Sequence, residues 1–286
     1  MSLGRESLPV AFEEVTHLDS PLFKAFYALY EAAFPIDDER EAPEALTVIQ
    51  ELNLDFAAQA AHGPYREVVV AIRAWDGGPV IGGHVFGMTS SDAHRAAGYA
   101  ASVQAIYAFL DPRVRGRVPM RRLVDHARRL ATDTFRLPGF VESMPPPVLL
   151  EVNNPLRMSA QEIELDTHSS GTSPFRRYLF WQRSGFSPLA FSYVQSALRD
   201  DAEPVRYLDL FCTRDSGPGL PADVLAEHLR TFVSMSVLKG VDVDRDVPFR
   251  EMRAWLAAHA GQRVKRDDGP DAAVIAARTR ALAGGA

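Results

Sequence analysis

Several residue types and patterns are rare or missing in this sequence of 286 residues. A single cysteine, Cys212, excludes an internal disulfide, and no cluster of Cys and His has the spacing of zinc ligands, so we expect no metal. No apolar run reaches the roughly 18 residues of a membrane span. The first ten residues also lack the apolar block of a signal peptide. These absences predict a cytoplasmic protein with no membrane partner.

Positive charge is scarce as well, but it is concentrated in one segment. The net charge is −6, with 37 acidic and 31 basic residues, which argues against a surface that coats nucleic acid or anionic lipid. Between positions 113 and 129, however, seven arginines stand against one acid, Asp125. No aromatic residues alternate with these arginines, so we expect no nucleic-acid partner. The fraction of hydrophobic residues, 47%, is that of an ordinary folded protein.

The spacing of apolar residues predicts an α/β chain with the element order βααββ-β-α-β-α-β-β. The long segment at 154–173 is expected to be a loop at the mouth of a site. In chain order the elements are a strand at 10–18, a helix from Pro21, a helix at 41–60, hairpin strands at 68–72 and 80–86, a strand at 103–110, a helix from Met120, a strand at 147–152, a helix at 175–184, and strands at 189–194 and 205–211.

The segment from 217 to 286 is of a different kind. A Gly/Pro linker at 217–219 leads to two amphipathic helices, at 224–232 and 249–256, and then to a loose polar tail from Lys265. We therefore divide the chain into a domain at 10–212 and a helical extension at 217–286. The extension could pack on the domain, cover its site or mediate a homodimer.

A basic loop joins the strand at 103–110 to the helix that follows it. Such an arrangement can bind phosphate, because free backbone N–H groups and the helix dipole point at the anion. The loop resembles the acetyl-CoA loop of the GCN5-related N-acetyltransferase (GNAT) family, since Arg115 and Gly116 match its common Arg-Gly start. Val118 and Met120 replace two residues that are small in the family. Pro119 has no N–H to donate, although proline suits the first turn of a helix.

Other segments resemble the same family, and they follow its order along the chain. They are Phe34-Pro35 with Glu39-Arg40-Glu41, Leu150-Glu151-Val152-Asn153, Arg183-Ser184-Gly185-Phe186 and Tyr193-Val194-Gln195-Ser196. The resemblance covers residues 10–212. It implies a GNAT-like fold: a mixed, mostly antiparallel sheet flanked by helices.

The resemblance also implies a co-substrate, acetyl-CoA or another acyl-CoA, bound where the fourth and fifth strands separate. Its pantetheine arm would bond to the backbone near Phe109 and Leu110, like an added strand. Arginine suits the phosphates because a guanidinium can donate two parallel hydrogen bonds to them. The implied phosphate contacts are Arg115, Gly116, Arg117, Val118 and Met120.

The implied reaction is direct attack of an amine on the thioester, so the protein must accept one proton and supply another. Glu151, near the end of a central strand, is the candidate base, or else a capped strand-end carboxylate. Trp181 stands where the family has its general-acid tyrosine, and an indole cannot serve as that acid. Tyr178, one turn earlier, is the candidate replacement, or else a packed helix residue.

Four residues are candidates for binding the acceptor: Glu39, Arg40, Asn153 and Tyr193. An exposed ion pair is the alternative for Glu39 and Arg40, and cross-strand packing is the alternative for Tyr193. The predicted function is an acyl-CoA-dependent N-acyltransferase that acts on a small amine. Two alternatives stay open: a transferase whose donor is acyl carrier protein, and a non-catalytic acyl-CoA-binding or interaction module.

Overall fold

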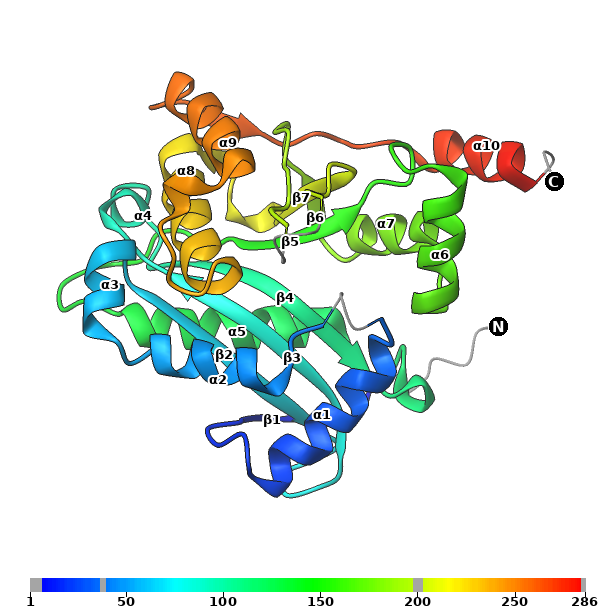
Figure 1. Ribbon diagram of the computed structural model, residues 1–286, viewed down its shortest axis with the longest axis horizontal. Coiled ribbons are helices and arrows are strands. Elements are labelled where there is room, and N and C mark those ends of the chain that lie inside the picture. The colour runs from blue at the N-terminus through cyan, green and yellow to red at the C-terminus, as the bar shows by residue number, and fades with distance from the viewer. Residues whose placement is uncertain (1–6, 37–39, 198–202, 284–286) are drawn as a thin grey trace.

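A seven-stranded sheet organises the protein in this computed structural model, which describes residues 7–36, 40–197 and 203–283 (Figure 1). The strand order is β1-β2-β3-β4-β5-β7-β6, and each neighbouring pair is antiparallel except β4 with β5. The predicted fold class is therefore confirmed. The strands are β1 (Ala11–Glu14), β2 (Tyr65–Arg73), β3 (Val80–Thr89), β4 (Ser102–Leu110), β5 (Val148–Asn153), β6 (Phe186–Pro188) and β7 (Leu208–Thr213).

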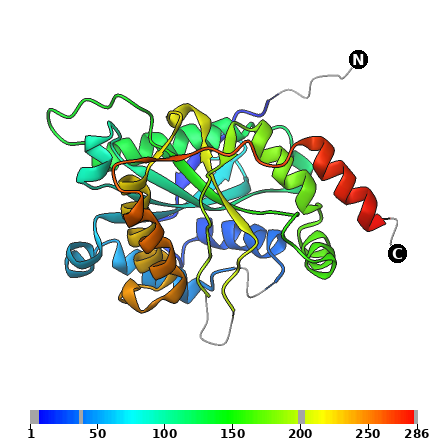
Figure 2. The same ribbon diagram turned by 90° about the horizontal axis from the view of Figure 1, so that it is seen from above.

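Helices cover both faces of the sheet, because its central strands are apolar on both sides (Figures 1 and 2). Along β2, Val68 and Val70 pack toward α5 and α7, whereas Val69 and Ala71 pack toward α1 and α2. The helices are α1 (Pro21–Ala33), α2 (Pro43–Leu52), α3 (Phe56–His62), α4 (Asp92–Ala96), α5 (Met120–Phe135), α6 (Ala160–Ser170), α7 (Pro174–Arg183), α8 (Ala222–Phe232), α9 (Val247–Ala258) and α10 (Ala272–Ala283).

Two helical predictions are corrected by local capping. The predicted helix at 41–60 is broken into α2 and α3, because the Asp55 side chain accepts hydrogen bonds from the first amides of α3 and starts a new helix there. The predicted loop at 154–173 contains α6. That helix begins with a capping box in which Ser159 and Glu162 each bond to the other's backbone N–H.

One predicted strand and the predicted linker also differ from the structure. The strand expected at 189–194 does not form: β6 ends at Pro188, and the chain then turns twice, with Phe191 N–H bonded to Leu189 and Tyr193 N–H bonded to Phe191. The linker at 217–219 leads into a short strand, β8 (Gly219–Pro221). It pairs with β9 (Arg263–Lys265), a segment close to the C-terminus.

The extension shares a hydrophobic core with the sheet. In α8, Val224, Leu225 and Leu229 are all 0% exposed and belong to one cluster with Leu149 of β5 and Leu210 of β7. The segment from Lys265, for which the sequence predicts a loose tail, carries α10. Ile275 of α10 is buried against α7 and the sheet.

A buried hydrogen-bond chain also connects α8 to β4. Ser102 of β4 lies 2.7 Å from His94 Nε2 and 2.7 Å from His228 Nδ1 of α8, and His228 Nε2 lies 3.1 Å from Gln104 Oε1. Because the Gln104 oxygen only accepts, His228 donates to it through Nε2 and receives the Ser102 proton at Nδ1. Burial lowers the pKa of each histidine to about 3, so both imidazoles are neutral at pH 7.

This shared core predicts one cooperative unfolding unit. Leu225→Ala should destabilise the whole protein by about 3 kcal/mol, because it opens a cavity in the common cluster. Leu165→Ala is the matched control, since that side chain is 61% exposed on α6 and should cost little. Urea unfolding followed by both fluorescence and circular dichroism would show a single transition. Two separate transitions, with only one moved by Leu225→Ala, would show that the extension folds independently.

Candidate active site

The site lies where β4 and β5 stop pairing. Their parallel ladder runs only from Val103 opposite Val148 to Ala105 opposite Leu150, although β4 continues to Leu110 and β5 to Asn153. A β-bulge accompanies the separation, because consecutive residues of β3 pair with Tyr107 and Ala105 and leave Ile106 as an extra residue. A bulge bends its strand and increases the local twist. The sequence prediction of an opening between these two strands is thus matched by the geometry.

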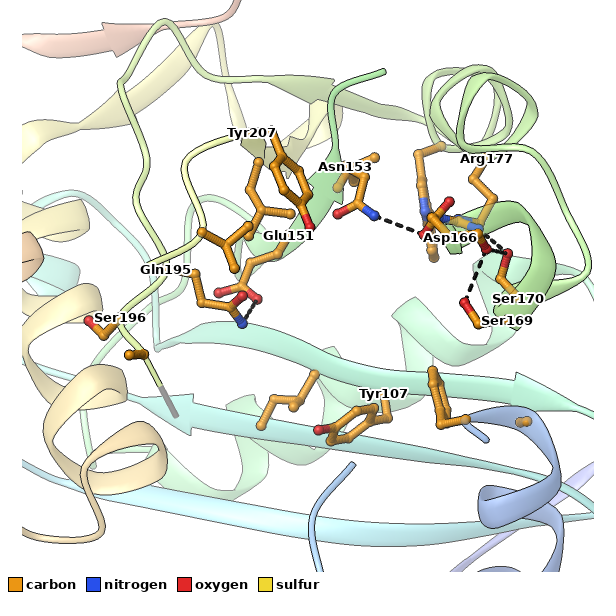
Figure 3. Close-up of a pocket in the computed structure, with 18 of the residues that line it drawn as sticks. Tyr107, Glu151, Asn153, Asp166, Ser169, Ser170, Arg177, Gln195, Ser196 and Tyr207 are labelled. Carbon is orange, nitrogen blue, oxygen red and sulfur yellow. Dashed lines mark hydrogen bonds and ion pairs between the residues drawn. The ribbon is translucent and has the colours of Figure 1, made fainter. Parts of the chain in front are cut away.

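A cavity of about 510 Å³ lies in the opening between β4 and β5 (Figure 3). The bulge lets two consecutive residues of β4, Ile106 and Tyr107, both line it. Opposite them are residues 151–153 of β5, and further walls come from the C-terminal end of α1, from α6 and α7, and from residues 195–197 and 203–208. The lining residues are Ala33, Phe34, Pro35, Ile106, Tyr107, Glu151, Val152, Asn153, Asp166, Ser169, Ser170, Arg177, Trp181, Gln195, Ser196, Ala197, Glu203, Val205, Tyr207 and Leu208.

Glu151 is the titratable group at the point of separation. It follows Leu150, the last residue of β5 that pairs with β4. The Tyr193 hydroxyl donates to Glu151 Oε1. Gln195 Nε2 donates to Glu151 Oε2 over 3.1 Å (Figure 3). Burial raises the pKa of this carboxyl to about 7, while the hydrogen bond from Tyr193 opposes that rise. A carboxylate with a pKa near 7 can accept a proton at neutral pH and release it again.

An ion pair between Arg177 and Asp166 forms the wall of the cavity opposite Gln195. Arg177 Nη2 lies 2.6 Å from Asp166 Oδ2, and Arg177 also donates to the Ser170 hydroxyl and to the Thr172 carbonyl. Asn153, a predicted acceptor contact, lies in the pocket, and its Nδ2 donates to Asp166 Oδ1 over 3.0 Å. These contacts hold the α6 and α7 side of the cavity in one arrangement.

The structure does not bring Tyr178 to this cavity. It is fully buried in α7 and donates to Asp209 Oδ2 over 2.7 Å, and the cavity that it lines is a different one. Burial is the main cause that raises the pKa of this hydroxyl. Trp181 instead lines the cavity that contains Glu151, and its ring packs against Phe186. This placement fits the interpretation of Tyr178 as a packed helix residue. It does not fit a general acid that acts in the cavity beside Glu151.

Two tyrosines that the sequence did not single out line the cavity: Tyr107 and Tyr207 (Figure 3). Tyr107 could have been found from its position in the predicted strand at 103–110, beside the expected opening. Burial holds its pKa well above the usual range. Tyr207 lies at the start of the predicted strand at 205–211, where the face that it presents depends on contacts that sequence spacing does not show.

The predicted acceptor contacts are only partly in the cavity. Arg40 lies beside it rather than in its lining: its Nη1 donates to the Phe34 carbonyl over 3.2 Å, and its Nη2 is 3.6 Å from Glu31. Glu39 lies outside the described residues. Tyr193 is 2% exposed and reaches the site only through Glu151.

The loop after β4 has the features of an anion site. Gly116 has φ of +79°, a left-handed conformation that favours glycine. Pro119 is the N-cap of α5, and no side chain caps the first amides of this helix. Val118 is 7% exposed because its side chain packs into the core with Leu123, so only its backbone can face a ligand. Met120 packs partly against the same cluster.

The three arginines of this loop differ in their exposure and in the contacts that they make. Arg113 is paired with Asp111. Arg115 is exposed, and its Nε donates to the Leu110 carbonyl over 3.3 Å. Arg117 is half-buried, and its backbone is bonded to Val114 and Leu8.

Of the two residues predicted to bond a pantetheine arm, Leu110 is suitably oriented and Phe109 is not. Asp111 N–H bonds to the Ile81 carbonyl of β3, and the Phe109 carbonyl points at Gly82, where an added Cβ would lie 2.3 Å from it. Backbone groups alternate in direction along a strand, so those of Leu110 and Ala108 face away from β3, toward the opening. The Phe109 side chain is itself packed against Phe26 in the core.

Among the described residues, no group of His, Cys, Asp and Glu side chains is arranged to hold a metal ion. Over the same described ranges, no helix is long and apolar enough to cross a membrane.

The raised pKa of Glu151 predicts a pH-dependent cost in stability. Its folded-state pKa of about 7 exceeds the ordinary value of 4.5, so the folded protein should lose stability as pH rises through that interval. Glu151→Gln has no such charge, and the Gln195 amide can flip to accept from it. We expect the variant to be more stable than wild type by roughly 1–3 kcal/mol at pH 8, with little difference at pH 5. Urea denaturation at both values tests this, with exposed Glu164→Gln as control, and a variant that is less stable at pH 8 would contradict it.

By sequence the chain matches no family model and no curated protein. Similar solved structures include a protein from Bacteroides thetaiotaomicron assigned to the GNAT family of acetyltransferases, with 18% identity over 81% of this chain and 99% of that one and a TM-score of 0.49. An aminoglycoside 6'-N-acetyltransferase solved with coenzyme A has 13% identity over 71% and 96%, with a TM-score of 0.39. A GNAT-family acetyltransferase of Staphylococcus aureus has 10% identity over 71% and 98%, with a TM-score of 0.38. The structural neighbours of this chain are thus GNAT-family acetyltransferases at low sequence identity, and this is the family that its motifs resemble.

Proposed function

We propose that the protein is an acyl-CoA-dependent N-acyltransferase that transfers an acyl group, most simply acetyl, to a small amine. The observation that carries this proposal is the position of Glu151. A carboxyl with a pKa of about 7 stands at the edge of an opening whose other side is the part of β4 that does not pair with β5. The loop that follows β4 then offers backbone amides and Arg115 to a phosphate.

The residues present fit a pantetheine thioester followed by a diphosphate. Ala108 and Leu110 direct backbone groups into the opening, where they can bond an extended amide chain as a neighbouring strand would. The uncapped first turn of α5 and the exposed guanidinium of Arg115 can then bind the diphosphate. The thioester end would lie near Glu151.

Glu151 would act as the general base. An amine is nucleophilic only when unprotonated, so Glu151 takes its proton before or during attack on the thioester carbonyl. The bond from nitrogen to the carbonyl carbon forms, the carbon–sulfur bond breaks, and the thiolate takes up a proton on leaving. Tyr193 and Gln195 fix both carboxylate oxygens, which limits the geometries in which the base can act.

The charges of the cavity suit a cationic acceptor. Among the described lining residues, Glu151, Asp166 and Glu203 are acidic and Arg177 is basic. Arg177 is already bound to Asp166 and Ser170, so it offers little to an incoming carboxylate. A protonated amine is therefore better matched than an amino acid bound through its carboxylate group.

Binding of the donor can be tested at the loop. Arg115→Ala should weaken acetyl-CoA binding about tenfold in isothermal titration, because it removes one charge-assisted contact with phosphate. Arg129→Ala is the matched control, since Arg129 is also exposed on α5 but lies more than two turns beyond its N-terminus. If neither acetyl-CoA nor CoA binds wild type, the free-CoA donor is wrong. Titration with an acyl carrier protein would then test the alternative donor.

Catalysis can be tested separately at the base. Glu151→Gln should lower kcat by about 10²- to 10⁴-fold, the usual contribution of a general base, and leave acetyl-CoA affinity unchanged. In wild type, the rate should rise with pH through about 7, as the carboxyl ionises. Thiol release measured over pH 5.5 to 9 with a panel of amines shows both effects. A variant that keeps the wild-type rate would exclude Glu151 as the base.

A further inference from the structure

The two side chains that hold Glu151 come from one short segment, residues 191–196, which forms no regular strand. It leaves the sheet after β6 and passes beside the cavity, where Gln195 forms an isolated bridge with Val205. Tyr193 and Gln195 both point from this segment to the Glu151 carboxylate. The position of the base therefore depends on what holds an irregular segment in place.

α9 of the extension holds it at three successive points. Phe191 packs edge-on against Trp255, with ring centroids 5.2 Å apart. Further along the segment, the Val194 backbone N–H points at the sulfur of Met252 over 3.5 Å.

The third point is at the start of α9. The Ser196 hydroxyl donates to Asp246 Oδ1 over 2.8 Å. The same carboxylate oxygen caps α9, because it accepts the Phe249 N–H over 2.7 Å. Asp246 thus links the helix terminus directly to the residue after Gln195.

α9 is itself firmly anchored. Phe249, Met252 and Leu256 are each 2% exposed and belong to the cluster that α8 shares with the sheet. In Figure 1, α9 lies against α8, away from α5 and its loop. α9 contributes no residue to the cavity lining, so it can act on the cavity only through the residues that it contacts.

We propose that the C-terminal extension is a positioning element of the active site: α9 fixes residues 191–196, and through them Tyr193 and Gln195 orient the Glu151 carboxylate. This inference rests on the proposed function, because it assigns α9 a role toward the base of that reaction. Tyr193 and Gln195 are positioning residues, and Ser196 acts one step further away.

A shift in the titration of Glu151 follows from this arrangement. Loss of the Tyr193 hydroxyl removes a donor that favours the charged carboxylate, so its pKa should rise and the rate should fall at neutral pH. The other ionisable groups on the cavity walls are left untouched by the change. They are Tyr107, Asp166, Arg177, Glu203 and Tyr207.

The test compares two variants with two matched controls. Tyr193→Phe and Ser196→Ala weaken the chain from α9 to Glu151. Tyr99→Phe loses a comparable buried hydrogen bond, to the Ser216 carbonyl, in the same hydrophobic cluster. Ser192→Ala removes an exposed hydroxyl from the same segment. Two readouts are taken: the pH profile of thiol release, and the titration of Glu151 by carbon NMR of ¹³C-glutamate-labelled full-length protein, assigned with Glu151→Gln.

Tyr193→Phe should move the Glu151 midpoint upward by about one pH unit. Ser196→Ala should move it in the same direction by less and lower kcat several-fold, with the KM for acetyl-CoA unchanged, and both controls should match wild type. Midpoints of Tyr193→Phe and Ser196→Ala equal to those of their controls would overturn the inference. If wild type turns over no amine, the proposed function fails, yet the NMR midpoints still decide whether α9 positions this carboxylate.

Discussion

The short pairing between β4 and β5 is the constraint on which the rest of the site depends. Every other strand of the large sheet pairs with its neighbours in antiparallel fashion, but these two are parallel and pair at only three positions. Past Ala105 the extra residue Ile106 bends β4 away, and β5 stays with β7. The separation leaves backbone groups of β4 without a partner on β5, opens a cavity, and places Glu151 at its edge.

Placing a carboxylate there has a cost, and the surrounding structure compensates for it. Burial raises the pKa of Glu151, and the hydrogen bond from Tyr193 offsets part of that rise, so the pKa settles at about 7. Gln195 holds the second carboxylate oxygen. These donors stand on a segment without regular structure, which α9 secures. On this proposal, a helix that is not part of the cavity lining contributes to the electrostatics of the cavity. The core that the extension shares with the sheet holds α9 in place for this role.

Local signals in the sequence predicted the framework, and long-range contacts decided the rest. The hairpin, the basic loop and the strand that carries Glu151 follow from apolar spacing, from Gly116 and from the family motifs. By contrast, the Tyr178 hydroxyl bonds to Asp209, a residue distant in sequence, and the Tyr193 hydroxyl bonds to Glu151 without lining the cavity. The hydrogen-bond partner of each tyrosine depends on which side chains meet in the folded protein. The spacing of residues along the chain does not show this.

The most direct test of the central claim is a crystal structure of the protein with CoA. The account predicts that the pantetheine arm lies between β4 and β5, bonded to the backbone of Ala108 and Leu110, with the diphosphate at the start of α5 and the sulfur beside Glu151. CoA bound at another surface, with the opening between β4 and β5 empty, would contradict it.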